Sequence, residues 1–326
     1  MIALGAPLGD VTDHLVGVFR DPAILLGIPL ALLGAVFMSF GAQYQYRGVT
    51  KVEQLTGTSG SAGLSGRQLV NLLRRPSWVF GTLMLAAAIT CQLSALAVAP
   101  LIIVQPIGAV SLVITTLLNA RISGHKPTRK SIRSIVACIT GIVVFVTIAA
   151  LFATETPVSN LQLIIILSLL LIVLIALLVL WLVLRKRGHP LFYIAAAGII
   201  YGFVATLAKV VISRVQARDF NWLTLLCLIG LVVAVVLGAY FVQTAYSVGP
   251  PDLVVAGLTV IDPIVAVTIG LTILQEAAEA PPWAFVGFVA AGAVAVYGVI
   301  TLARYHPQVI SDSQEIPIPR GGGGKV

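Results

Sequence analysis

Nine long apolar stretches are the feature that most constrains the fold of this chain. A helix needs about 20 mostly apolar residues to cross the hydrocarbon layer of a membrane. The stretches that reach this length cover about residues 24–45, 78–98, 100–120, 132–152, 161–184, 191–213, 222–246, 251–274 and 282–303. In lipid, backbone polar groups must be satisfied within a helix or a closed barrel, and these stretches are too long and too uniformly apolar for barrel strands. We therefore expect an all-α polytopic membrane protein with about nine transmembrane helices.

The composition excludes several other classes of protein. The chain is 59% apolar and 10% charged, whereas soluble proteins are about 45–50% apolar and about 25% charged. This excludes a soluble enzyme, a disordered protein and a nucleic-acid-binding domain, because the net charge of +8 comes from the loops between apolar stretches. Cys91, Cys138 and Cys227 lie within apolar stretches and far apart, so we expect core residues and neither a metal site nor a disulfide. We expect no cofactor and no nucleic-acid partner.

The basic residues predict how the chain is oriented in the membrane. With the N-terminus outside, 16 of the 20 Lys and Arg residues fall in or beside the cytoplasmic connections and the C-terminal tail, and three, Arg20, Arg214 and Arg218, fall outside. Cytoplasmic loops carry an excess of Lys and Arg. We predict a protein integral to the plasma (inner) membrane, with its N-terminus outside and its C-terminus in the cytoplasm.

The two halves of the chain resemble each other. The segment AVAPLIIVQPIGAVSLVITTLLNARISGHKP matches SVGPPDLVVAGLTVIDPIVAVTIGLTILQEAAEAPP, and GAVFMSFGA matches GIIYGFVA. Pro100 lies 41 residues before Gly141, as Pro251 lies 41 residues before Gly292. Because five spans separate equivalent helices, the second copy must run in the opposite direction. Inverted repeats around a midplane site are typical of secondary transporters.

The repeat predicts how the chain is divided. The expected parts are an N-terminal surface segment (1–23), a first repeat of four helices (24–152), a connecting helix (153–190), a second repeat of four helices (191–303) and a disordered cytoplasmic tail (304–326).

The chain also resembles the drug/metabolite transporter superfamily, and within it the nine-span branch related to NIPA-type magnesium transporters. The resemblance is carried by GAQYQYRG, ALAVAPLIIVQPIGAVSLVITTLL, ATLAKVV, VIDPIVAVTIGLTILQE and AAGAVAVYGVITL, across about residues 24–303. The chain departs from the family where Gly124–His125 replaces a Gly-Glu pair, while Glu276 keeps the glutamate in the second half. The resemblance implies transport of a small solute, with magnesium as the best-known cargo of the family.

Asp262 is the strongest candidate for a binding or coupling residue. It lies near the middle of the eighth apolar stretch and directly precedes Pro263. An acidic group within a membrane span is costly and marks a functional site by default. Proline has no N–H for the carbonyl four residues earlier, so we expect a helix break that frees the carbonyl of Thr259 beside the carboxylate. The alternative is a packing kink whose aspartate bonds a neighbouring helix.

Two further charges have two interpretations each. Lys209 lies about one turn from the outer end of its span, so its side chain either reaches the interface or points inward, to pair with Asp262 or to hold an anionic group. Tyr201 shares a helix face with Lys209, because the two positions are eight residues apart. Glu276 either meets solvent at the outer end of the eighth span or joins Asp262 as a metal ligand.

Polar residues in otherwise apolar spans are the remaining candidates. Such residues either line a cavity or pack helices together, and Pro106 is a second expected helix break beside them. The polar candidates in these spans are Ser39, Gln43, Gln105, Ser111, Thr115, Asn119 and Gln243.

These observations favour a secondary transporter that works by alternating access, with the proton as a candidate coupling ion. A single mid-membrane carboxylate and a nearby lysine suit Mg²⁺ poorly, because this ion prefers octahedral oxygen ligands. The sequence alone therefore favours an organic metabolite, a drug or a lipid-linked headgroup, with Mg²⁺ as the alternative. A scaffold is a weaker alternative, and we expect no enzyme because the Asp and His residues do not cluster. The expected partners are the bilayer and the solute, with a homodimer as a candidate assembly.

Overall fold

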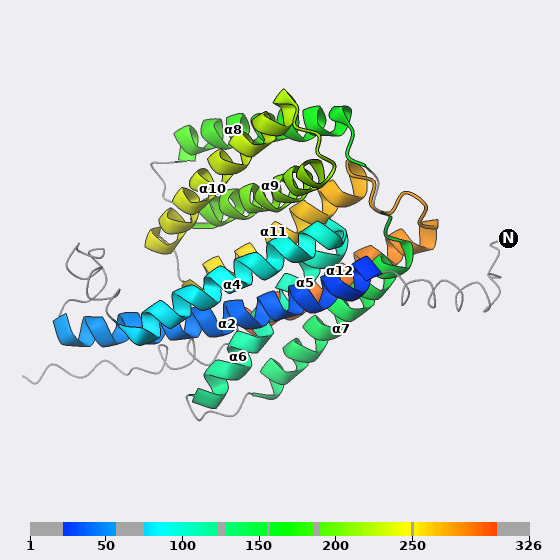
Figure 1. Cartoon of the computed structure of the whole chain (residues 1–326). Coiled ribbons are helices and arrows are strands. Elements are labelled where there is room, and N and C mark those ends of the chain that lie inside the picture. The colour runs from blue at the N-terminus through cyan, green and yellow to red at the C-terminus, as the bar shows by residue number, and fades with distance from the viewer. Residues whose placement is uncertain are drawn as a thin grey trace, which may run out of the picture.

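The computed structural model describes residues 22–56, 75–122, 128–154, 157–184, 190–248 and 251–304, and the regular structure of these residues is α-helical. The predicted N-terminal surface segment and C-terminal tail lie almost wholly outside the described residues. Within the described part, nine segments are long and apolar enough to cross a membrane, as predicted. The helices are α2 (Pro22–Thr56), α4 (Pro76–Val98), α5 (Leu101–Gly108), α6 (Val110–Ile122), α7 (Arg129–Phe152), α8 (Asn160–Leu184), α9 (Pro190–Gln216), α10 (Trp222–Val248), α11 (Pro251–Thr272) and α12 (Pro282–Arg304) (Figure 1).

The third span is broken into two helices. α5 ends at Gly108, Ala109 forms a turn, and α6 begins at Val110. The N–H of Ala109 donates to the carbonyl of Pro106 at 3.2 Å. This bond spans three residues, whereas the hydrogen bonds of an α-helix span four. Pro106 removes one backbone donor within the same turn, so the expected break at this proline is present.

The expected break at Pro263 is not present. α11 runs from Pro251 to Thr272 with Pro263 inside it. A proline interior to a membrane helix removes one hydrogen bond, and close packing by neighbouring helices can keep the helix continuous. Here α9 packs along α11 at this level, with Gly198 against Ile261 and Gly202 against Val265.

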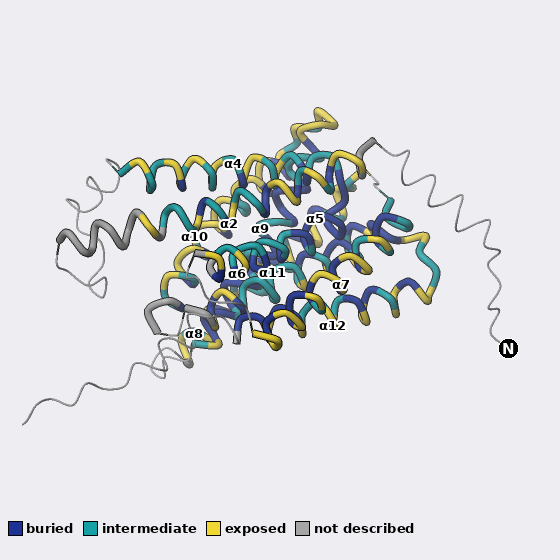
Figure 2. Tube along the Cα trace, turned by 90° about the horizontal axis from the view of Figure 1, so that it is seen from below, coloured by how far each residue is buried: buried dark blue, intermediate teal, exposed yellow. Residues whose placement is uncertain are grey.

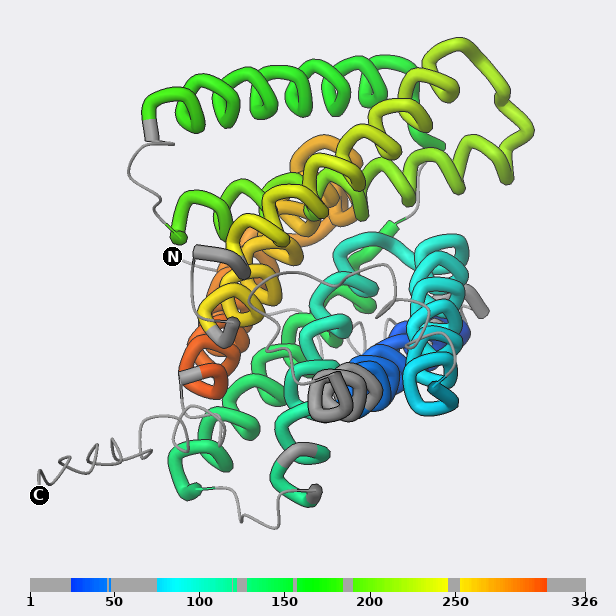
Figure 3. Tube along the Cα trace, turned by 90° about the vertical axis from the view of Figure 1, so that its left-hand side faces the viewer, coloured from blue at the N-terminus to red at the C-terminus, as the bar shows by residue number. Residues whose placement is uncertain are grey.

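Two sets of four spans make equivalent contacts. We call α2, α4, α5–α6 and α7 the first set, and α9, α10, α11 and α12 the second set. α2 packs along α4 as α9 packs along α10, and α2 contacts the broken span as α9 contacts α11. Across the molecule, α7 packs along α12 and α5 contacts α11. α8 lies at the edge of the bundle beside α10 (Figures 1 and 3).

Burial identifies the centre of this bundle. In the span of α9, 67% of the residues in its most apolar window are buried, and in the broken span 56%, whereas the other spans reach at most 39%. Buried residues gather on α5, α9 and the facing sides of their neighbours (Figure 2). The outer faces carry exposed Leu, Ile and Val side chains, as on α8 and α10, which is the pattern of a surface that meets lipid.

Candidate functional site

Asp262 lies near the middle of α11 and is the centre of the candidate site. Its Oδ1 atom is buried and has no hydrogen-bond partner among the described residues. Two glycines of α9 bring the neighbouring backbone close: a Cβ atom on Gly202 would lie 3.0 Å from the carbonyl oxygen of Asp262, and one on Gly198 would lie 2.7 Å from Cβ of Ile261. A carboxylate oxygen in a low-dielectric surrounding is costly unless it is compensated. The geometry therefore leaves one strong acceptor uncompensated inside the bundle.

Tyr201 lies one residue before Gly202 on α9, the helix that packs against α11 beside Asp262. The ring lies against Gly238 of α10, where a Cβ atom would be 3.2 Å from Cε1 of the tyrosine. Gly238 thus makes room for the ring between α9 and α10.

The two prolines named from the sequence meet at one cavity. Pro106 and Pro263 both line a space of about 90 Å³ together with Thr259. The other lining residues, from the broken span and α7, α11 and α12, are apolar or small: Ala109, Ile142, Phe145, Val260, Ile264, Val267, Gly292, Ala295, Val296 and Val299. Asp262 does not line this cavity. The carboxylate lies on the α9 side of α11 and the cavity on the α5 side.

Gln105 directly precedes a proline in the first set, as Asp262 does in the second. The sequences Gln105–Pro106–Ile107 and Asp262–Pro263–Ile264 resemble each other. Gln105 is 6% exposed and lies on α5, and α5 contacts α11. The molecule therefore carries one carboxylate and one neutral amide, each directly before a proline.

Ser39 and Ser111 are held in helix packing. The hydroxyl of Ser39 lies 2.8 Å from the carbonyl oxygen of Ser111 on α6 and 2.8 Å from that of Ala35 on its own helix. The hydroxyl of Ser111 donates to the carbonyl of Gly108 at 2.7 Å. These bonds bridge the break in the third span and tie α2 to it.

The remaining polar candidates are not gathered around Asp262 by any contact described for them. Gln43 and Thr115 are half-buried, and Gln243 is exposed on α10. The side chain of Asn119 lies outside the described residues. The hydroxyl of Thr259 donates to the carbonyl of Val255 on its own helix at 2.8 Å. For these residues a binding role stays a prediction.

Lys209 takes the inward of its two predicted placements, and Glu276 does not meet solvent as one of its two interpretations had it. Lys209 is 6% exposed, so its ammonium does not reach the interface; it donates to the carbonyls of Leu96 and Ala99, both at 2.9 Å. Glu276 is 4% exposed and therefore is not solvated; its two carboxylate oxygens accept from the N–H groups of Leu101 and Ile102, both at 2.9 Å. Both side chains form hydrogen bonds to the ends of helices that lie more than 100 residues away in the sequence. Local sequence patterns therefore did not predict these roles.

We expect Ser39→Ala to lower stability slightly and to leave transport unchanged. The substitution removes the bond that ties α2 to the break, and such bonds between membrane helices contribute about 0.6 kcal/mol on average. The measurement compares the thermal midpoint and the transport rate of the purified variant with those of the parent. A large loss of transport at unchanged stability would instead show that Ser39 contacts the solute.

Nine apolar spans, a helix broken within the membrane and a mid-span carboxylate with one buried oxygen that has no partner among the described residues are together typical of a polytopic membrane transporter. The family model for the magnesium transporter NIPA matches residues 23–220. The chain therefore belongs to the NIPA family, as its motifs indicated. The match ends before α10, so the roles of Asp262 and Glu276 are argued from the structure.

Two other comparisons add to this. The chain is 24% identical over 290 residues to an uncharacterized protein of Corynebacterium glutamicum, and the alignment covers 86% of this chain and 95% of that protein. The two proteins are thus alike over nearly their whole lengths. No solved structure matches the chain.

Proposed function

We propose that this protein transports magnesium across the membrane by alternating access, and that Asp262 is its cation-binding and coupling residue. The observation that carries the proposal is the buried Oδ1 atom of Asp262, which has no partner among the described residues. A cation or a proton at this atom would supply the missing compensation. A residue that needs an ion in one state and can do without it in another is suited to couple ion binding to a change of state.

The family match favours an ion over an organic solute, because the matching model is that of the magnesium transporter NIPA. The cavity beside the two prolines, of about 90 Å³, is smaller than the about 300 Å³ at which pockets for organic ligands begin, and it lies on the other side of α11 from Asp262. Mg²⁺ usually keeps several waters and binds through one or two carboxylates. We therefore prefer the ion, which reverses the preference drawn from the sequence alone.

The position of Lys209 also answers the sequence-based objection that a lysine near Asp262 suits a divalent cation poorly. Its ammonium is bonded at the end of α4, and Lys209 lies seven residues beyond Gly202, which is about 10 Å along the helix axis. Pro263 offers no N–H to the carbonyl of Thr259, which leaves one backbone oxygen of α11 without a helical N–H donor.

The two sets of spans are the moving parts in this proposal. They make equivalent contacts, and repeats of this kind rock against each other around a site near the midplane. With the N-terminus outside, as the basic loops predict, the end that carries the α4–α5 turn faces outward and the opposite end faces the cytoplasm.

Flux measurements on purified protein in liposomes test the proposed cargo. A magnesium-sensitive dye inside the vesicles reports entry of Mg²⁺, and a pH-sensitive dye reports proton movement when a panel of organic metabolites is added. We expect saturable Mg²⁺ entry that empty liposomes lack. A proton flux that follows an organic metabolite, with no entry of Mg²⁺, would replace the ion by the organic solute.

A further inference from the structure

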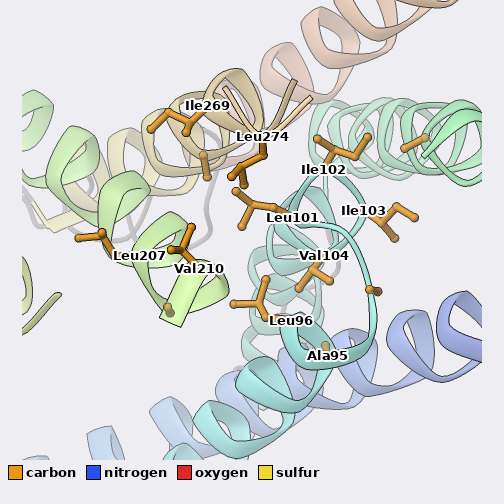
Figure 4. Packing of buried hydrophobic residues seen from close by; sticks show 14 of the residues in the cluster. Ala95, Leu96, Leu101, Ile102, Ile103, Val104, Leu207, Val210, Ile269 and Leu274 are labelled. Carbon is orange, nitrogen blue, oxygen red and sulfur yellow. The ribbon is translucent and has the colours of Figure 1, made fainter. Parts of the chain in front are cut away.

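The turn between α4 and α5 is held by two buried charges from the second set. Lys209 of α9 bonds the last carbonyls of α4, and Glu276 of the α11–α12 connection bonds the first amides of α5. The apolar side chains of the turn pack with Leu207, Val210, Ile269 and Leu274 of the second set in one core cluster (Figure 4). Charged side chains of the second set therefore bond the end of α4 and the start of α5, on both sides of this short turn.

The sign of each charge matches the helix end that it bonds. The C-terminus of a helix carries partial negative charge and the N-terminus partial positive charge. An ammonium at the end of α4 and a carboxylate at the start of α5 are thus both favourable, and charge-assisted bonds of this kind are stronger than neutral ones. Gly270 leaves room for the carboxylate, since a Cβ atom there would lie 3.0 Å from Oε2 of Glu276.

Hydrogen bonds between neutral groups also join the two sets at this end of the bundle. The side chain of Gln216 on α9 donates to the carbonyl of Ala97 at 3.0 Å, and the N–H of Thr154 donates to the carbonyl of Glu276 at 2.8 Å. The first joins α9 to the α4–α5 turn, and the second joins the end of α7 to the α11–α12 connection. This end of the bundle is therefore tied across both sets.

The opposite end is built differently. Counted without a gap from the pair Gly34 and Gly198, Gln45 of α2 stands opposite Lys209. Gln45 donates to Thr82 of α4 at 3.0 Å, which is a bond within the first set. In the described ranges, α4 packs on α9, whereas the equivalent helices α10 and α2 contact each other sparsely at most. Within the described ranges, the two sets are thus bonded to each other closely at the α4–α5 end and not in the same way at the opposite end.

We propose that Lys209 and Glu276 form a latch that holds the transporter closed at the α4–α5 end. Opening of the pathway at this end requires that α4 and α5 leave the second set, which breaks the four charge-assisted bonds. The latch makes the state closed at this end the resting state. This inference rests on the alternating access proposed above, but not on the identity of the cargo.

Cysteine labelling tests the latch without any transport. The reporter is Val210→Cys, because Val210 is fully buried beside Lys209, in a chain whose Cys91, Cys138 and Cys227 are replaced by alanine. A membrane-impermeant maleimide is added to full-length protein in liposomes. We expect labelling roughly tenfold faster with Lys209→Met or Glu276→Gln than with the parent, since each removes charged bonds. Gln45→Met, the matched control at the opposite end, should leave the rate unchanged.

A charge exchange separates the latch from a simple ion pair. The double variant Lys209→Glu with Glu276→Lys keeps both charges but puts each at the wrong helix end, so we expect labelling at least as fast as in the single variants. Restoration of the parental rate would overturn the helix-end mechanism.

Folding is checked by size-exclusion chromatography of each variant. Glu276→Gln keeps the size of the side chain and one acceptor, so it serves if Lys209→Met does not fold. Parental labelling in a folded single variant would overturn the latch. Faster labelling without any Mg²⁺ flux in the parent would leave the latch standing and overturn the proposed cargo.

Discussion

Asp262→Asn should abolish transport and leave the protein as stable as the parent or more stable. Substitution of a mere partner of a metal ligand costs about 10- to 100-fold in affinity or activity, so loss of the ligand itself should lower Mg²⁺ flux by about 100-fold or more. The Oδ1 atom is buried without a partner, and a neutral amide there costs less than an uncompensated charge. The measurements are Mg²⁺ entry into liposomes and the thermal midpoint of the purified variant.

Two further variants make this result specific. Asp262→Glu keeps the charge on a longer side chain and should retain part of the flux. Glu279→Gln removes an acidic group from an exposed position in the α11–α12 connection and should change neither flux nor stability. If Asp262→Asn lowers the thermal midpoint and keeps the flux, then the aspartate has a packing role and the proposed site is wrong.

The parts of the fold that local sequence determines were predictable. Each span is recognised by its own length and apolarity, so the nine spans follow from the sequence within a few residues. Asp262 can be named as a candidate from the sequence alone, because an acidic group in a span is rare whatever surrounds it; its role stays a prediction. The NIPA family followed from short motifs near the ends and middles of the spans.

The effects of two prolines could not be separated from the sequence. Pro106 and Pro263 each directly follow a polar residue within a span, yet the helix breaks at Ala109 after Pro106 and continues through Pro263. The first lies within three residues of Gly108 and Ala109, where the chain turns and side-chain hydroxyls of serines bond the backbone. The second lies where α9 packs against α11 through two glycines. Packing by other helices decides the outcome, and packing is not local.

The roles of Lys209 and Glu276 depend on contacts across the whole chain. Glu276 bonds amides 175 and 174 residues earlier, and Lys209 bonds carbonyls 113 and 110 residues earlier. Position near a span end predicts solvent or interface for such residues, because long charged side chains reach water where they can. Only the approach of the second set to the α4–α5 turn makes burial of both charges favourable.

The second large effect is expected at the contact between α7 and α12, where the fourth spans of the two sets meet. A Cβ atom on Gly141 would lie 2.4 Å from the backbone nitrogen of Ala295 and 2.8 Å from the carbonyl oxygen of Ala291. On the other side of the contact, a Cβ atom on Gly298 would lie 2.4 Å from the backbone nitrogen of Cys138. The atoms in the way belong to the backbone, so no rotamer change can relieve the clash.

Gly141→Ala should therefore force the two helices apart and lower the thermal midpoint by roughly 5 °C or more, since overpacking costs about 1–3 kcal/mol or above. The matched control is Gly108→Ala, because a Cβ atom on Gly108 meets nothing within 4 Å; this variant should keep the parental midpoint. Because α7 and α12 join the two sets, we also expect the folded fraction of Gly141→Ala to transport more slowly, while Gly108→Ala keeps its rate. Equal midpoints for the two alanine variants would show that the sets do not need this close approach.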